Sequence, residues 1–211
     1  MQAYNILKEM ISHKLAVVIR GENHSMAYET AQACIKGGLK LLEVTFTVPG
    51  AERLIRTLSA EGGDVLVGSG TVLDSETARI AILAGAKFIV SPGFDANTAK
   101  LCNRYGIPYL PGCMTVNEML QAAEYGVSVI KLFPGDAFQP SFIQNIHGPL
   151  PHIEIMPTGG ITLDNVGGWL KAGAAMVGVG GEITKPAKTG DYEKVEALAR
   201  SFRQSVRMVG D

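Results

Sequence analysis

Short apolar runs alternate along this chain with longer segments whose apolar residues recur at helical spacing. The run at residues 15–19 is continuously apolar, which is typical of a strand covered on both faces. Strands are predicted at residues 15–19, 39–45, 65–69, 87–90, 108–110, 127–132, 153–156 and 174–179. Helices are predicted at about residues 3–12, 25–36, 50–60, 75–85, 95–106, 115–126, 141–147, 162–171 and 192–208.

The order of these elements predicts the fold class. Strands that alternate with helices pair in parallel through right-handed crossovers. Eight such units after a short N-terminal helix predict a single (β/α)₈ TIM barrel domain over residues 1–211, whereas five or six would favour an open doubly wound sheet. No G-x-G-x-x-G motif follows the first predicted strand, and Gly68-Ser-Gly70 lacks the third glycine, so a dinucleotide-binding site is not expected.

Composition narrows the classes of partner. The 211 residues carry a net charge of -1, so we expect no nucleic-acid partner. The first eleven residues mix charges with apolar positions, and no apolar run approaches the roughly 20 residues that span a bilayer. We therefore expect a cytoplasmic protein without a membrane partner. The three cysteines and four histidines are scattered without metal-ligand spacing, so no metal and no cofactor are predicted.

Lys131 stands inside the apolar run at residues 127–134. A lysine is rarely buried without a partner, and desolvation favours the neutral amine that can attack a carbonyl. The alternative is structural, since a lysine at the end of a buried strand can extend its charge to solvent over an apolar stem. The run itself leaves both interpretations open.

Glu43 lies between Leu42 and Val44 in a predicted buried strand. An unpaired carboxylate is costly to bury there, so it either meets a cation or serves in proton transfer. In a closed barrel Glu43 and Lys131 can point into one cavity. A lysine beside a carboxylate is the minimal set of groups for Schiff-base chemistry.

Polar and glycine residues collect where the predicted strands end, which is where barrels place their active sites. Gly159-Gly160 and Gly180-Gly181 follow the last two strands, the usual position of a phosphate site. Tight turns also use such pairs. Candidate hydroxyl donors, each also a possible helix cap or turn residue, are Thr71, Ser91, Thr115 and Thr158.

Taken together, the strand-end motifs resemble the family of 2-keto-3-deoxy-6-phosphogluconate aldolases and 4-hydroxy-2-oxoglutarate aldolases. The motifs occur in order at residues 42–45, 68–73, 88–93, 111–115, 130–134, 157–161 and 179–181. The resemblance implies a class I aldolase barrel, commonly trimeric, so a homotrimer is expected. It implies Lys131 as the Schiff-base lysine and Glu43 as the acid and base. It further implies pyruvate contacts from Thr71, packing from Pro92 and Phe133, and phosphate contacts from the Gly159-Gly160 loop.

Two positions depart from the pattern that this resemblance implies. Thr47 stands where familiar members carry an arginine that helps to hold the pyruvyl carboxylate, and a hydroxyl cannot replace a bidentate cation. Glu182 follows Gly180-Gly181 where a serine is common, and its charge would oppose a phosphate. Both departures bear on the substrate and leave the lysine and glutamate in place.

The resulting hypothesis is reversible cleavage of a 2-keto-3-deoxy sugar acid, 6-phosphorylated, to pyruvate and an aldehyde such as glyceraldehyde 3-phosphate. 4-Hydroxy-2-oxoglutarate is a further possible substrate. One alternative is a sugar-phosphate isomerase or epimerase with Glu43 as base and Lys131 as an electrostatic stabiliser. The other is a non-catalytic sugar-phosphate binding protein, for which a buried lysine and glutamate are needlessly costly.

Overall fold

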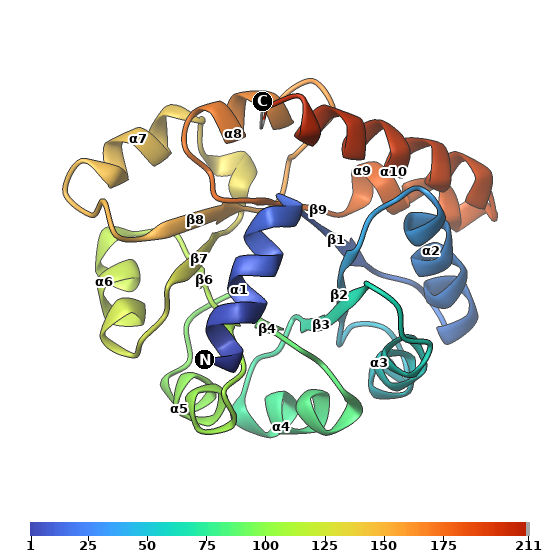
Figure 1. Ribbon diagram of the computed structural model, residues 1–211, viewed down its shortest axis with the longest axis horizontal. Helices are drawn as coiled ribbons and strands as arrows, with labels where there is room; N and C mark the ends of the chain where they lie inside the picture. Colours follow the sequence, from blue (N-terminus) through green and yellow to red (C-terminus); the bar gives the residue numbers. More distant parts are fainter. Residues whose placement is uncertain (210–211) are drawn as a thin grey trace.

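The computed structural model describes residues 1–209 and shows strands and helices alternating along the chain (Figure 1). The last two residues of the expected 1–211 domain lie outside the described residues. The strands are β1 (Leu15–Ile19), β2 (Leu41–Thr45), β3 (Leu66–Gly70), β4 (Ile89–Val90), β5 (Tyr109–Leu110), β6 (Gly112–Cys113), β7 (Val129–Leu132), β8 (Glu154–Pro157) and β9 (Val177–Val179). The helices are α1 (Gln2–His13), α2 (His24–Lys36), α3 (Ala51–Ala60), α4 (Ser75–Ala84), α5 (Ala96–Tyr105), α6 (Val116–Glu124), α7 (Ser141–His147), α8 (Val166–Lys171), α9 (Gly181–Thr184) and α10 (Tyr192–Arg207), with 3₁₀ turns η1 (Gly135–Ala137) and η2 (Lys185–Thr189).

The strand pairs of residues 1–209 are parallel, as the strand and helix order predicts. One sheet has the order β5-β4-β3-β2-β1-β9, and the other has the order β6-β7-β8. In the first sheet Val18 lies opposite Glu43, and Glu43 lies opposite Gly68. In the second sheet Gly112 lies opposite Lys131. The two candidate catalytic residues therefore come from different sheets.

The fifth strand differs from its prediction. The sequence predicts a single strand at residues 108–110, whereas the chain forms β5, passes Pro111 and continues as β6. Proline has no N–H to give to a ladder, so it interrupts the pairing. On either side of Pro111, β5 pairs with β4 and β6 pairs with β7, while the Gly112 N–H still donates to the carbonyl of Ser91, just after β4.

The two sheets approach each other on the opposite side as well. Thr158, just after β8, forms an isolated parallel bridge with Gly178 in β9. In Figure 1 the strands curl around a common centre and most helices lie outside them. The architecture is an α/β fold whose parallel strands form a strongly curled sheet.

The curled strands enclose a small apolar interior. Alternate strand residues point into it, as the two-residue period of a strand requires. Ile6 and Met10 of α1 join this interior, and Figure 1 shows α1 crossing the centre of the strands. Helix α1 therefore covers the end at which the strands begin. The inward-facing strand residues are Ala16, Leu41, Leu66, Phe88, Val90, Leu110, Val129, Met156 and Met176.

Several helix starts differ from their predictions. Helix α2 begins at His24, and its cap is Asn23, whose side chain accepts a hydrogen bond from the Met26 N–H, so Ser25, where the helix was expected to begin, lies inside it. Helix α8 begins at Val166 rather than 162, after a turn in which Asn165 and Thr162 exchange hydrogen bonds. The segment α9 and η2 has no counterpart in the prediction.

Within residues 1–209 no helix combines the length and the apolar character needed to cross a lipid bilayer.

Candidate active site

Lys131 and Glu43 meet inside the curled sheet. Lys131 Nζ lies 3.6 Å from Glu43 Oε1, and both side chains are almost completely buried. Lys131 comes from β7 and Glu43 from β2, on opposite sides of the enclosed space. The expectation that the fold brings these two residues together is confirmed. A salt bridge this deeply buried is weak evidence of a purely stabilising role, because desolvation offsets much of the attraction.

Glu43 has unused hydrogen-bonding capacity. Within residues 1–209 neither carboxylate oxygen has a hydrogen-bond partner, and the Lys131 contact at 3.6 Å is too long to count as one. A buried carboxylate normally accepts several hydrogen bonds. These free acceptor positions face the Lys131 amine, where a proton-transferring group would be needed.

Gly70 makes room for the Glu43 side chain. A β-carbon at Gly70 would lie 2.6 Å from both Cγ and Cδ of Glu43, closer than carbon atoms approach. Gly70 is the last residue of β3, two residues beyond Gly68, which pairs with Glu43. A glycine is therefore required here for space. The sequence pattern does not reveal this requirement, because Gly70 and Glu43 lie on different strands.

Thr71 follows directly and has a φ of 55°. A β-branched residue rarely adopts a positive φ, and the conformation costs about 1–2 kcal/mol. Strain of this kind persists where the surrounding structure imposes it, and it clusters at functional sites. The structure thus places Thr71 beside Gly70 in a conformation that a simple turn residue would avoid.

Phe133 lies close to the lysine. Lys131 Nζ is 4.8 Å from the centre of the Phe133 ring. Pro92 comes from the loop after β4, and Gly112, the neighbour of Lys131 across the sheet, packs against the Pro92 carbonyl. Pro92 and Phe133 are each partly exposed. Phe133 thus borders the amine directly, and Pro92 lies against Gly112, the neighbour of Lys131 across the sheet.

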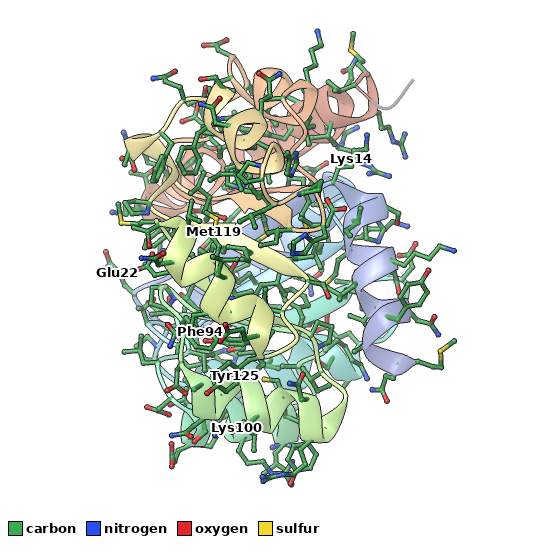
Figure 2. The ribbon with its side chains drawn as sticks, turned by 90° about the vertical axis from the view of Figure 1, so that its left-hand side faces the viewer. Lys14, Glu22, Phe94, Lys100, Met119 and Tyr125 are labelled. Atoms are coloured by element: carbon green, nitrogen blue, oxygen red, sulfur yellow. The ribbon has the colours of Figure 1, made fainter. Side chains whose placement is uncertain are left out.

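The loop that carries Pro92 is held by aromatic residues. Tyr109 Oη donates to the Gly93 carbonyl and accepts from the Asp95 N–H. Burial raises the pKa of Tyr109 to about 12, so the hydroxyl stays protonated and keeps donating. The Phe94 ring packs on Tyr125 at 5.3 Å, and Figure 2 shows both side chains on the same side of the molecule.

The predicted glycine pairs come together around one cavity of about 280 Å³. Its wall includes Thr158, both glycine pairs and Phe133. Because the Phe133 ring also lies beside the Lys131 amine, Phe133 borders both the cavity and the amine. The φ values of Gly159 and Gly160 are 101° and 67°, which only glycine adopts without strain. Within residues 1–209 the buried Thr158 hydroxyl has no hydrogen-bond partner. The glycine pairs and Thr158 are therefore placed as the sequence predicts.

Thr47 takes a different place. It lines a neighbouring cavity of about 460 Å³, together with Arg20, Lys185 and Lys188. Thr47 is exposed, and its hydroxyl lies 2.7 Å from the hydroxyl of Thr45. This neighbouring cavity shares Arg20, Gly181 and Glu182 with the cavity of the glycine pairs, and Thr47 lines the neighbouring one.

Arg20 is a candidate site residue that the sequence motifs did not identify. It directly follows β1 and lines both the cavity of the glycine pairs and the cavity of Thr47. The available signal was its position, because a charged residue at the carboxyl end of a buried barrel strand points to function.

The fold and the buried pair of Lys131 and Glu43 together define a class of protein. A parallel α/β fold with a buried lysine and a carboxylate between the strands, and glycine loops on an adjoining cavity, is the arrangement of a Schiff-base aldolase. The comparisons agree with this class. Residues 6–198 match the model of the aldolase family described as KDPG and KHG aldolase.

Relatives match over nearly the whole chain. The 2-dehydro-3-deoxy-phosphogluconate aldolase of Treponema pallidum is 36% identical over 197 residues, covering 92% of each chain. The KHG/KDPG aldolase of Escherichia coli K12 is 33% identical over 196 residues, covering 91% of each chain. The KDPG aldolase of Legionella pneumophila, solved with pyruvate captured as a covalent carbinolamine intermediate, has a TM-score of 0.82 and 29% identity, covering 89% of this chain and 93% of that one. The protein belongs to the KDPG and KHG aldolase family.

Proposed function

We propose that this protein is a class I aldolase that reversibly cleaves a 2-keto-3-deoxy sugar acid, 6-phosphorylated, to pyruvate and an aldehyde such as glyceraldehyde 3-phosphate. 4-Hydroxy-2-oxoglutarate is a second substrate in this proposal. The observation that carries it is the buried pair of Lys131 and Glu43, with Nζ and Oε1 3.6 Å apart, in a member of an aldolase family.

Lys131 supplies the nucleophile. Its neutral amine attacks the C2 ketone of the substrate and forms a carbinolamine. Loss of water then gives the protonated imine, which draws electrons from the bond between C3 and C4. When this bond breaks, the aldehyde leaves and the pyruvyl part remains as an enamine on Lys131.

Glu43 moves the protons, directly or through a water. It gives a proton to the departing carbinolamine hydroxyl and takes one from the C4 hydroxyl as the carbon bond breaks. Its unpartnered oxygens, within residues 1–209, leave acceptor positions for these steps. Protonation of the enamine at C3 and hydrolysis of the imine then release pyruvate and restore the free amine.

The remaining candidate residues hold the two ends of the substrate. At the pyruvyl end we assign contacts to Thr71 and to the apolar surfaces of Pro92 and Phe133. Thr47 is assigned only a peripheral contact, because it lines the neighbouring cavity. At the other end the backbone N–H groups of the glycine loops and the Thr158 hydroxyl face the phosphate, with the loop residues Gly159, Gly160, Gly180 and Gly181 around it.

Borohydride reduction in the presence of pyruvate tests the proposal. Reduction of the imine is expected to fix pyruvate covalently to Lys131, as mass spectrometry of the digested protein would detect. Lys131→Met is expected to lose both the adduct and the release of pyruvate. Lys87→Met is a matched control, because Lys87 is exposed and precedes β4. Absence of an adduct on Lys131 in the unmodified protein would sink the mechanism, and turnover retained in Lys131→Arg would favour an isomerase.

The finer architecture is part of the same proposal. We assign the chain to a single closed (β/α)₈ barrel in which β5 and β6 count as one interrupted strand, supported by the Thr158–Gly178 bridge between the sheets. We further propose a homotrimer, which sedimentation equilibrium would test. A cytoplasmic location fits Cys34, Cys102 and Cys113, which are unpaired buried thiols, and cell fractionation would test it.

A further inference from the structure

The loop after β4, residues 91–95, has few backbone attachments. At its start the Gly112 N–H donates to the Ser91 carbonyl at 3.0 Å. Within residues 1–209, the next three residues of the loop, 92–94, form no hydrogen bond between backbone groups. One of these three is Pro92, which has no N–H to donate. The loop therefore depends on side chains to hold its position.

Tyr109 supplies this attachment. Its hydroxyl donates to the Gly93 carbonyl at 3.2 Å and accepts from the Asp95 N–H at 3.1 Å. In the part of the chain that the structure describes, no other side chain forms a hydrogen bond with residues 92–94. One hydroxyl thus holds the loop on both sides of Phe94. Because the hydroxyl proton is used at Gly93, the group acts through the loop rather than as an acid.

Tyr109 is itself firmly placed. It lies in β5 with 7% of its surface exposed, and it pairs with Ile89 of β4 across the sheet. The Phe94 ring lies 6.5 Å from the Tyr109 ring and 5.3 Å from the Tyr125 ring. Figure 2 shows Phe94 and Tyr125 on the same side of the molecule. A packed strand residue has little freedom to move, so its hydroxyl fixes where the loop after β4 lies.

The loop reaches the strand that adjoins Lys131. A β-carbon on Gly112 would overlap the Pro92 carbonyl, so the backbones of these two residues are in close contact. Gly112 lies opposite Lys131 across the sheet. A movement of the loop after β4 therefore changes the packing next to the residue that carries the reactive amine.

We propose that Tyr109 is a positioning residue that holds Pro92 in the wall of the pyruvyl end of the site by tying the loop after β4 to β5. The proposal rests on the proposed aldolase function, because it concerns the end of the substrate that joins Lys131. Without the hydroxyl, the loop leaves its observed position part of the time. The apparent affinity for the pyruvyl group then falls in proportion to the fraction of molecules that keep this position.

Tyr109→Phe tests the proposal, because it removes the hydroxyl and keeps the ring. Borohydride trapping over a series of pyruvate concentrations gives the half-saturating concentration, and initial rates with a phosphorylated 2-keto-3-deoxy acid give KM and kcat. We expect the half-saturating concentration and KM to rise roughly 5- to 20-fold, as for two lost hydrogen bonds. We expect kcat to change by less than about 3-fold, because molecules that bind keep the lysine and the glutamate. A merely structural role would lower stability in urea without separating KM from kcat.

Tyr125→Phe is the matched control. The Tyr125 ring also packs on Phe94, but within residues 1–209 its hydroxyl makes no hydrogen bond, so its removal should change KM by less than about 2-fold. Gly93→Ala provides a rescue. A β-carbon at Gly93 would meet nothing within 4 Å and its φ is not positive, so alanine fits and stiffens the loop. Added to Tyr109→Phe, it should lower the half-saturating concentration again by about 2- to 4-fold.

Hydrogen exchange measures the loop directly. The Asp95 N–H should be protected in the unmodified protein and should exchange faster in Tyr109→Phe. Rapid exchange in the unmodified protein would overturn the proposal, as would an unchanged half-saturating concentration in Tyr109→Phe. An equal rise in Tyr125→Phe, or no recovery in the double variant, would also overturn it, because the loss would then have a cause other than the tie to Tyr109. Absence of the pyruvate adduct in the unmodified protein would instead reject the aldolase function.

Discussion

Replacement of Gly70 by alanine should damage catalysis by displacing Glu43. A β-carbon at residue 70 would lie 2.6 Å from Glu43 Cγ and Cδ, whereas carbon atoms pack at about 3.5–4.0 Å. The Glu43 side chain must therefore shift by about 1 Å, and it is 99% buried with little space around it, since only 1% of it is exposed. A displacement of this size can cost roughly 100-fold in rate. Overpacking of the interior should also cost about 1–3 kcal/mol of stability.

Two measurements test this expectation. The release of pyruvate in a coupled assay gives kcat, and urea unfolding gives the free energy of unfolding. Gly148→Ala is the control, because a β-carbon there would meet the Asn145 carbonyl at an ordinary 3.5 Å and the φ of Gly148 is -54°. The control should change neither quantity by more than about 0.5 kcal/mol or its equivalent in rate.

A double-mutant cycle identifies the cause. If the contact with Glu43 produces the destabilisation, Gly70→Ala should cost much less in a Glu43→Ala background. The same cost in both backgrounds would mean that another neighbour of residue 70 resists the methyl group. Normal kcat and stability in Gly70→Ala would refute the reasoning altogether.

Three further outcomes follow from other parts of the structure. Thr71→Gly should raise the free energy of unfolding by roughly 0.5–1 kcal/mol in urea titrations, because it relieves a positive φ, while the KM for pyruvyl substrates rises. Glu182→Gln should lower the KM for phosphorylated substrates several-fold in initial-rate assays, because it removes a like charge from the cavity; an unchanged KM would place the phosphate elsewhere. A thiol reagent at pH 8 should modify the native protein slowly and the unfolded protein at once, because burial raises the pKa of each thiol to about 12; rapid native labelling would contradict the burial of Cys34, Cys102 and Cys113.

Local sequence patterns predicted most elements because they depend on neighbours in the chain. The apolar run at residues 15–19 became β1 with matching bounds, and α7 matches its predicted range of 141–147. Thr115 caps α6 through a capping box with Glu118, as its type and spacing favour. The start of α2 was predicted one residue late, at Ser25, since Asn23 and Ser25 are both good caps and the sequence does not rank them.

The candidate pair was also visible in the sequence, for an energetic reason. Lys131 and Glu43 each stand in an apolar run where a charged group is costly, so each requires a compensating partner. The sequence cannot measure their separation, because they are 88 positions apart in the chain and come from different sheets. Only the curling of the sheets brings the amine and the carboxylate to 3.6 Å.

The sequence by itself determined which charged residues are energetically costly to bury, and it determined the order of the strands and helices. The tertiary structure decided what surrounds them. It placed Arg20 in the wall of the glycine-pair cavity and committed the Thr47 hydroxyl to Thr45, and it set Gly70 against Glu43. Such relations depend on strand alternation and on register between strands, which are set by packing across the whole molecule rather than by any local run of residues.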